Sequence, residues 1–451
     1  MWDRGVPGPE GTPARPVVFG ISEDRPGPEG APLSHYLLRY CSDMDRRTFV
    51  KAALPALGAF RLPAAAAAPA MKITRIETVY WKSREAAPFW PHWVWVRVHT
   101  DTGQAGLGET YPRNEAEAAV IHSGAARMLL GRDPRDIERI WSDLYNAFDF
   151  QVTGGAEMRV LSAVDLALWD LLGNSLNAPV YRLIGGRANP RVRVYNTCFP
   201  HKYDFNKEPE KIMRELIDGY GIRAIKVWPF DRAASRNRRQ YVTQQDIDEG
   251  LAPVRKLRDA FGDSIEILME FHSFWNLTSA IRIAKALEPL KPMWLEDMLM
   301  PGNFQQYRQL AEATSLPLTI SERMAGRMQF EQLLEARAAK FVMFDLCWCG
   351  GLSEGRKIAA MADAHLLPFA PHTAGGPLLF YASTHLTTAM PNVWIQESVQ
   401  RYYERDWPAM LENPIVPKNG AVEAPDLPGF GMRVKPEAWD HPAAVRQTTA
   451  L

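Results

Sequence analysis

Residues 265–272 read Ile-Glu-Ile-Leu-Met-Glu-Phe-His, a short and mainly apolar run that ends in two ionisable side chains, Glu270 and His272. A run of this length, bounded by polar residues, is typical of a buried β-strand. A single acid after a strand usually caps a helix or faces solvent. The pattern gains meaning here because it recurs along the chain at a nearly constant interval.

From residue 190 onward, short apolar runs alternate with amphipathic helices such as 247–261 and 278–289. The chain contains eight such runs, at 191–199, 224–229, 265–271, 293–296, 316–321, 340–345, 366–371 and 392–396. Strand–helix alternation repeated eight times predicts an α/β protein with a parallel (β/α)₈ barrel, and a doubly wound open sheet is the alternative.

Six ionisable residues lie at or just after the ends of these runs, each 23 to 27 residues from the next. One strand–helix unit therefore separates each residue from its neighbour. The carboxyl ends of barrel strands converge on one face, so we expect these side chains to meet in one pocket. The six are Glu270, Glu296, Glu322, Asp345, His372 and Glu397.

Three consecutive strands supply carboxylates, Glu270, Glu296 and Glu322. Carboxylate oxygens suit a hard cation, and Mg²⁺ is favoured because it keeps positions free for water or substrate oxygens. Without a cation the three charges would repel one another, or some would be protonated. No pair of cysteines and histidines has the spacing of a zinc site. The sequence therefore predicts a magnesium site.

His372 is a candidate general base, because an ordinary histidine has a pKa near 6.5 and can be neutral at pH 7. Asp345, one strand earlier, is placed to accept a hydrogen bond from the other ring nitrogen. A metal beside a substrate carboxylate stabilises the negative charge that forms when the α-proton leaves. The pattern predicts abstraction of the proton α to the carboxylate of a small-molecule substrate.

Alternating residues in 71–111, followed by a helical pattern over 115–176, predict an α+β capping domain before the barrel. We expect four segments: a disordered leader at 1–70, the capping domain at 71–190, the catalytic barrel at 191–400, and a C-terminal segment at 401–451 that returns to the cap. An aromatic segment at 82–93, with Phe89, Trp90 and Trp93, is the predicted lid over the barrel.

The leader contains Arg46-Arg47 followed by Phe49, Lys51 and an alanine-rich stretch, which resembles a twin-arginine export signal. Small residues at 68–70 would suit a signal peptidase, and translation could also begin at Met44. We expect a periplasmic or exported protein, with a cytoplasmic location as the alternative.

Composition excludes several classes of partner. The formal net charge is zero, so neither nucleic acid nor an anionic membrane is expected to bind. No apolar run approaches the roughly 18–20 residues that span a bilayer. Four cysteines are too few for a disulfide scaffold, and Cys347 and Cys349 are expected to pack in the core. We expect a homo-oligomer.

Several motifs together resemble the enolase superfamily, in its mandelate racemase and acid-sugar (galactonate-type) dehydratase branch. The resemblance covers residues 71 to about 435. Its motifs are the run 163–170 through Gly185-Gly186, Ile320-Ser321-Glu322-Arg323-Met324, Ala370-Pro371-His372-Thr373 and the tail 425–431.

The resemblance implies a role for each site residue. Glu270, Glu296 and Glu322 would hold Mg²⁺, Asp345 and His372 would form the base dyad, and Glu397 would hydrogen-bond the substrate carboxylate. Lys226 matches the first lysine of a Lys-x-Lys motif and would help neutralise that carboxylate. His272 would be the general acid, because acid-sugar dehydratases often have histidine at this position; a substrate-binding or structural role is the alternative. We expect its side chain to point to the same side as that of Glu270, since the two are separated by one strand position.

Two residues depart from the family pattern. Trp228 occupies the second lysine position of the motif, which removes the usual base on the opposite face and weakens a racemase interpretation. Glu270 replaces the more common aspartate ligand and adds one methylene.

The favoured function is therefore dehydration of a sugar acid to a 2-keto-3-deoxy acid. An epimerase or racemase that uses His372 and His272 on opposite faces is one alternative. An exported sugar-acid binding protein with vestigial catalytic residues is another. A metal-dependent hydrolase barrel is disfavoured because its His-x-His motif is missing from the first strand, 191–199.

Overall fold

The structure, a computed structural model, describes residues 70–81, 92–148 and 154–451. The predicted leader with its export signal, up to residue 69, lies outside these residues, as does the predicted lid apart from residues 92 and 93. The described residues form one unit, Ala70–Leu451. No helix among them is both long and apolar enough to cross a bilayer.

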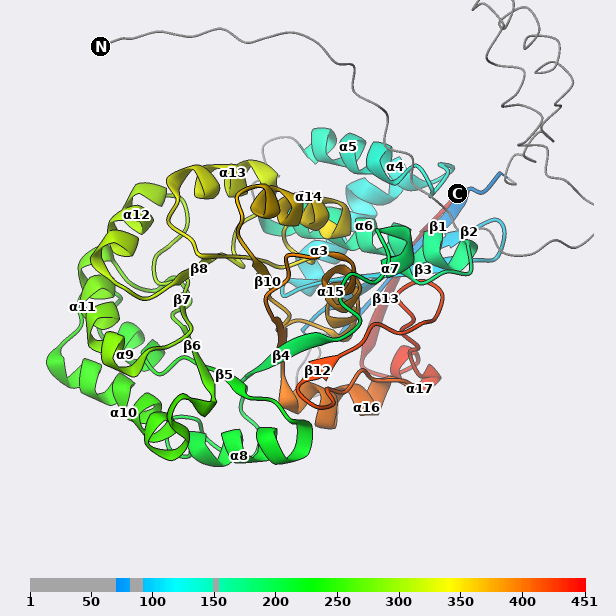
Figure 1. The fold of residues 1–451 in the computed structure, drawn as a ribbon. Helices are drawn as coiled ribbons and strands as arrows, with labels where there is room; N and C mark the ends of the chain where they lie inside the picture. Colours follow the sequence, from blue (N-terminus) through cyan, green and yellow to red (C-terminus); the bar gives the residue numbers. More distant parts are fainter. Residues whose placement is uncertain (1–69, 82–91, 149–153) are drawn as a thin grey trace, which may run out of the picture. The chain divides into compact units, whose positions relative to one another are not determined.

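Eight parallel strands form the predicted barrel (Figure 1). The hydrogen-bonded order is β10-β9-β8-β7-β6-β5-β4-β11, and a bridge between Phe369 and Val393 brings the two ends of the sheet together. The barrel prediction is confirmed. The strands are β4 (Val192–Thr197), β5 (Ala224–Val227), β6 (Glu266–Glu270), β7 (Trp294–Glu296), β8 (Leu318–Ile320), β9 (Phe341–Phe344), β10 (Phe369–Pro371) and β11 (Gln396–Ser398).

A ring of helices covers the outside of these strands (Figure 1). Local signals set their ends: Thr243 and Asp246 form a capping box at the start of α10, and Gly221 follows α8 with a left-handed φ of 69°. The helices are α8 (Pro209–Tyr220), α9 (Asp231–Arg236), α10 (Gln244–Phe261), α11 (Leu277–Leu287), α12 (Phe304–Ala313), α13 (Arg327–Ala336), α14 (Gly351–Ala364) and α15 (Pro377–Ala389).

The pleat of the strands sorts the barrel interior into two layers. Apolar side chains fill the lower layer, and an ionisable residue that lies two positions further along the same strand points to the same side. Leu268 precedes Glu270 and Trp294 precedes Glu296 in this way. Glu322 does not follow this pattern, because Ile320, two positions before it, is not part of the layer. The lower layer consists of Tyr195, Ala224, Leu268, Trp294, Phe341, Met343, Ala370 and Ile395.

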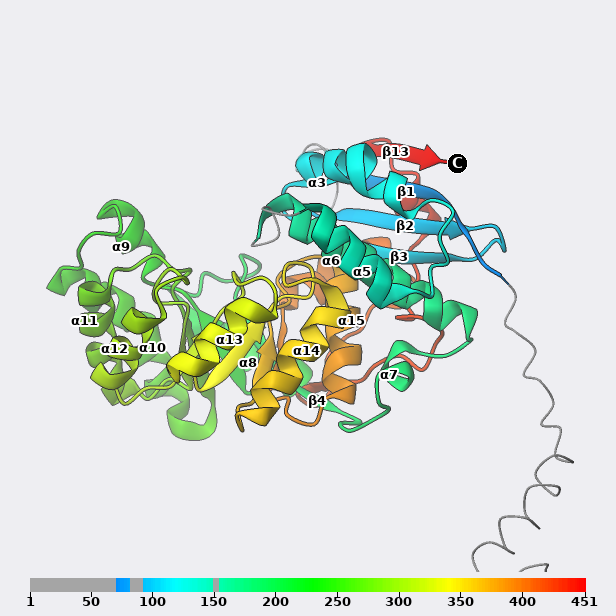
Figure 2. The ribbon, with the colours of Figure 1, turned by 90° about the horizontal axis from the view of Figure 1, so that it is seen from above.

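The predicted α+β cap is also present and is completed by the C-terminal tail, as expected. Its antiparallel sheet has the order β13-β1-β2-β3, and the last strand of the chain lies beside β1 (Figure 2). Strands β1 (Ile73–Trp81), β2 (Val94–Thr100), β3 (Ala105–Thr110) and β13 (Ala444–Ala450) form the sheet.

Helix α6 (Gly155–Ser175) packs against β3, and three shorter helices precede it in the cap. Asp170 of α6 accepts hydrogen bonds from the backbone nitrogens of Leu107 in β3 and Phe430 in the tail. The tail also forms β12, which pairs with barrel strand β4. The remaining elements are α3 (Asn114–Val120), α4 (Ala126–Leu129), α5 (Ile137–Phe148), α7 (Val180–Leu183), α16 (Trp407–Met410), β12 (Ala421–Val422) and α17 (Pro436–Trp439).

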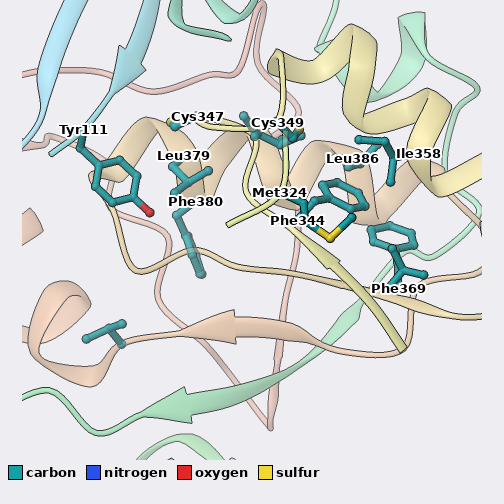
Figure 3. Packing of buried hydrophobic residues seen from close by; sticks show 14 of the residues in the cluster. Tyr111, Met324, Phe344, Cys347, Cys349, Ile358, Phe369, Leu379, Phe380 and Leu386 are labelled. Atoms are coloured by element: carbon teal, nitrogen blue, oxygen red, sulfur yellow. The ribbon is translucent and has the colours of Figure 1, made fainter. Parts of the chain in front are cut away.

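Buried contacts join the cap to the barrel. Glu109 in β3 accepts hydrogen bonds from the backbone nitrogens of Leu378 and Leu379, in the first turn of α15, where a carboxylate interacts favourably with the helix dipole. Figure 3 shows the apolar part of this junction, where Tyr111 lies close to Cys347 and to Leu379 of α15. Both Cys347 and Cys349 are buried, free cysteines in the core.

The close approach of β3 to α6 predicts that the stability of the cap depends on a glycine at position 108. A Cβ on Gly108 would lie 1.9 Å from the carbonyl oxygen of Ala163, so Gly108→Ala should lower the free energy of unfolding by ~1–3 kcal/mol. Gly124→Ala is the matched control, because a Cβ there meets nothing within 4 Å. Denaturant unfolding of both variants checks this, and equal stability of the two would contradict it.

Candidate active site

Three buried carboxylates meet at the mouth of the barrel. Glu270 ends β6, Glu296 ends β7, and Glu322 follows β8 by two residues. One carboxylate oxygen from each lies within 4.8 Å of the others. Glu270 and Glu296 are paired partners on neighbouring strands, which explains their closeness. The structure thus brings together the three predicted metal ligands, and their oxygens could hold one cation.

Lys226 of β5 lies directly beside these carboxylates. Its Nζ is 2.7 Å from Glu296 Oε1, 3.0 Å from Glu397 Oε1 and 3.4 Å from Glu270 Oε2. The ammonium group is buried, so solvent screens these attractions little. Lys226 therefore neutralises part of the carboxylate cluster.

Glu397 of β11 is held by neighbours on both of its oxygens. Oε1 forms an ion pair with Lys226 and accepts a hydrogen bond from the hydroxyl of Thr197, and Oε2 accepts one of 2.5 Å from the backbone nitrogen of Thr373. Burial opposes ionisation of Glu397, but the nearby charge of Lys226 and His372 lowers its pKa below the ordinary value. The carboxylate is fixed in place and ionised.

His372 and Asp345 form the predicted pair, and a third residue joins them. The Nδ1 of His372 is 2.7 Å from Asp345 Oδ2, and the hydroxyl of Tyr111 donates to the same oxygen at 2.5 Å. The backbone nitrogen of Cys347 donates to the other carboxylate oxygen of Asp345 at 2.7 Å. The Nε2 of His372 faces the carboxylate cluster, 3.0 Å from Glu322 Oε2.

His272 lines the same cavity, but the prediction that strand alternation orients its side chain is wrong. Strand β6 ends at Glu270, and His272 has a left-handed φ of 50°, so strand alternation does not orient it. Asp231, at the start of α9, instead holds the ring, with 2.7 Å between its Oδ2 and His272 Nδ1. The site therefore contains two histidine–aspartate pairs.

The charges of the cluster shift several pKa values. Burial and the charge of Glu270 raise the pKa of Glu296 well above its ordinary value. Burial alone would lower the pKa of both histidines of the site, but neighbouring carboxylates outweigh this effect. Glu322 and Glu397 raise the pKa of His372 to about 9. Glu270 and Asp231 raise the pKa of His272 to about 9. Without a cation, the site thus offsets its negative charge with protons.

These groups surround a cavity of about 280 Å³. Lys226, Glu270, Glu322, His372 and Glu397 line it, with His272 on its wall, while Glu296 and Asp345 contact these residues from behind. Tyr111 and Thr197 also line the cavity, beside three aromatic residues: Phe199, Trp228 and Trp348.

Reasoning from the sequence missed four residues of the site. Tyr111 lies in the cap, and nothing in the sequence shows that it reaches the barrel. Asp231 follows the second barrel strand, where its position resembles that of the other strand-end acids. Thr197 and Thr373 lie at the end of β4 and beside His372, and neutral side chains at those positions carry no comparable signal.

Two family models match the chain. The model of the mandelate racemase / muconate lactonizing enzyme N-terminal domain matches residues 84–185, and that of the enolase C-terminal domain-like family matches residues 210–438. The chain belongs to the enolase superfamily.

The similarity extends over almost the whole length of the related proteins. A D-galactonate dehydratase of Xanthomonas euvesicatoria pv. vesicatoria (strain 85-10) is 32% identical over 376 residues, which are 81% of this chain and 93% of the relative. A crystal structure of an enolase of the mandelate racemase subgroup from Agrobacterium tumefaciens is 38% identical, covers 84% of this chain and 99% of its own, and has a TM-score of 0.77. The predicted family and enzyme class, a hydro-lyase, are confirmed.

Tyr111 gives this enolase-superfamily site a testable property. Tyr111→Phe removes one hydrogen bond from Asp345, which leaves more negative charge to stabilise protonated His372. The pKa of His372 should rise further, by up to about one unit, the equivalent of one hydrogen bond. Histidine Cε1–H resonances in the metal-free protein report this titration, and His372→Asn assigns the signal.

Tyr145→Phe is the matched control, because Tyr145 stacks on Trp141 in the cap and does not line the cavity. An unchanged midpoint for His372 in Tyr111→Phe would show that Tyr111 has no influence on the base.

Proposed function

We propose that this enzyme is a Mg²⁺-dependent dehydratase of a sugar acid. One observation carries the proposal: two histidines, each held by an aspartate, line a cavity beside three carboxylates that could share one cation. Dehydration needs a base for the α-proton and an acid for the departing hydroxyl, and the two pairs could supply both.

The donor set fits magnesium. Glu270, Glu296 and Glu322 offer only oxygen ligands, are buried, and have one oxygen each within 4.8 Å of the others. Bound there, Mg²⁺ would stabilise the negative charge that develops on the substrate carboxylate when the α-proton leaves.

His372 would accept the α-proton at Nε2, the ring nitrogen that faces the carboxylate cluster. Its other nitrogen is held by Asp345, which fixes the ring and stabilises the imidazolium that forms. A cation beside Glu322 would lower the raised pKa of His372, so that the ring could be neutral before the reaction.

On the other wall, His272 would donate a proton to the departing β-hydroxyl. A cation on Glu270 would weaken one of the charges that raise the pKa of His272, but Asp231, which is not among the candidate ligands, would continue to favour the protonated ring that a general acid requires. Asp231 holds the ring in position from behind. Lys226 would neutralise the charge of the substrate carboxylate, since it lines the cavity. Glu397 lines the same cavity and would hydrogen-bond that carboxylate after taking up a proton, because two ionised carboxylates repel each other.

The substrate class follows from the relatives and from the cavity. Relatives of this chain include D-galactonate dehydratases that are 32% identical to it. A six-carbon sugar acid is accordingly the first substrate to test, and D-galactonate is the first member of that class.

The decisive experiment incubates a library of aldonic acids with the enzyme and Mg²⁺ and measures 2-keto-3-deoxy acid. We expect product from at least one acid, and His372→Asn should lower kcat by ~10²–10⁴-fold. His365→Asn, at an exposed position after α14, is the matched control and should retain activity. The same incubation in deuterated water distinguishes an epimerase. That enzyme would give inverted, deuterated substrate and no keto acid.

Magnesium binding should be visible without any substrate. Mg²⁺ at 100 times its Kd should raise the free energy of unfolding by about 2.7 kcal/mol. Protons should be released on binding, because the raised pKa of Glu296 must fall when the cation binds. Thermal unfolding measures the first effect, and calorimetry in buffers of different ionisation enthalpy measures the second.

Glu296→Gln should remove both effects of Mg²⁺. Glu335→Gln, at an exposed position on α13, should leave them unchanged. Equal responses of the two variants would refute the assignment of Glu296 as a metal ligand.

A further inference from the structure

A second cavity lies beside the catalytic one. Its volume is about 720 Å³, compared with about 280 Å³ for the catalytic cavity. The segment 198–206 after β4 and the residues Trp228, Asp231 and Arg232 after β5 form its walls. Phe199 and Trp228 line both cavities, so the two are neighbours at the same end of the barrel.

Trp228 forms the partition between them. Its ring contacts Phe205 edge-on at 4.8 Å between centroids and Phe199 at 5.7 Å, and on the catalytic side it meets His272 at 5.9 Å. Each of these contacts has the T-shaped geometry that aromatic pairs favour. The partition is therefore an aromatic side chain that packing holds in place. It occupies the position where the family motif has a lysine.

The second cavity combines aromatic faces with polar groups of both signs. Phe199, Tyr203, Phe205 and Trp228 supply the rings, and Lys202, Asp204, Asn206 and Arg232 supply donors and acceptors. A pyranose ring matches this combination, because its C–H faces pack on aromatic rings while its hydroxyls need hydrogen-bond partners. Lys202, Asp204, Asn206 and Arg232 also make ion pairs or hydrogen bonds within the protein, which hold these polar groups in place around the cavity.

The volumes of the two cavities also favour a sugar ring in the second one. A cavity of about 280 Å³ is near the lower limit of the roughly 300–1,000 Å³ typical of ligand pockets, and it suits an open-chain sugar acid. The product water needs only about 30 Å³, so its release does not account for a neighbouring cavity of about 720 Å³.

We propose that the second cavity is a sugar-binding subsite, and that the preferred substrate is a glycosylated sugar acid. The acid end occupies the catalytic cavity, and a pyranose ring attached beyond the β-carbon lies in the second cavity. This inference rests on the proposed dehydratase function and names the substrate class of the same site. The reaction itself is unchanged: water leaves, and the product is a 2-keto-3-deoxy acid that still carries the glycosyl group.

The test compares free aldonic acids with their glycosylated forms. Oxidation of disaccharides whose reducing sugar is glucose, galactose or mannose gives pairs that share the stereochemistry of the acid. For the acid that reacts, we expect kcat/KM of the glycosylated form to exceed that of the free form by at least about tenfold, as two or more ring contacts would provide.

Tyr203→Ala tests the subsite directly. Tyr203 lines the second cavity and not the catalytic one, and it is 36% exposed, so the fold should tolerate the change. We expect kcat/KM for the glycosylated acid to fall by about threefold to tenfold, the size of one aromatic contact, with no change for the free acid. Tyr241→Ala, at a tyrosine 56% exposed that lines neither cavity, should affect neither substrate.

The outcomes separate the two proposals. Turnover of free acids with equal or lower kcat/KM for the glycosylated ones would overturn the subsite and leave the dehydratase standing. An equal loss for both substrates in Tyr203→Ala would also overturn it. Turnover of glycosylated acids alone would support both proposals, and keto acid from neither kind would refute the dehydratase itself and the subsite with it.

Discussion

The burial of negative charge at the barrel mouth is the constraint on which the site depends. Glu270, Glu296 and Glu397 surround one ammonium group, that of Lys226, and all four side chains are buried. Buried charges are costly unless they are paired, so the cluster is stable only with counter-charges. Lys226 supplies one, and the charges of the cluster raise the pKa values of Glu296 and His372, which favours protons as further counter-charges. A divalent cation could replace those protons.

The cap takes part in the site as well as covering it. Glu109 and Tyr111 are two residues apart at the end of β3, and they reach different parts of the barrel: Glu109 the start of α15, Tyr111 the carboxylate of Asp345. The same short segment thus anchors the cap and contacts the Asp345–His372 pair. A shift of β3 relative to the barrel would change the hydrogen bonding of Asp345, so the position of the cap and the pKa of His372 are physically coupled.

The barrel and its strand-end residues could be predicted from the sequence because both follow from local periodicity. Seven of the eight predicted runs contain their strand, whereas the eighth, 392–396, overlaps β11 only at Gln396, so its boundaries were wrong. A period of two places Glu270 and Glu296 above apolar neighbours. Tyr111 could not be predicted, since its contact with Asp345 spans 234 positions between two domains. His272 reaches the cavity through a left-handed backbone conformation, which a pattern of side chains does not reveal.

The proposed metal and the proposed base would be linked through Glu322, which is both a candidate ligand and the carboxylate nearest to His372 Nε2. Without a cation, Glu322 stabilises the protonated ring, the form that cannot accept a proton. A cation on Glu322 would weaken that stabilisation, and the ring could then lose its proton. Glu322 would therefore allow His372 to accept a proton only when the cation is bound. The same cation would stabilise the negative charge that forms on the substrate. An ordinary aspartate–histidine pair placed away from the metal would lack this dependence.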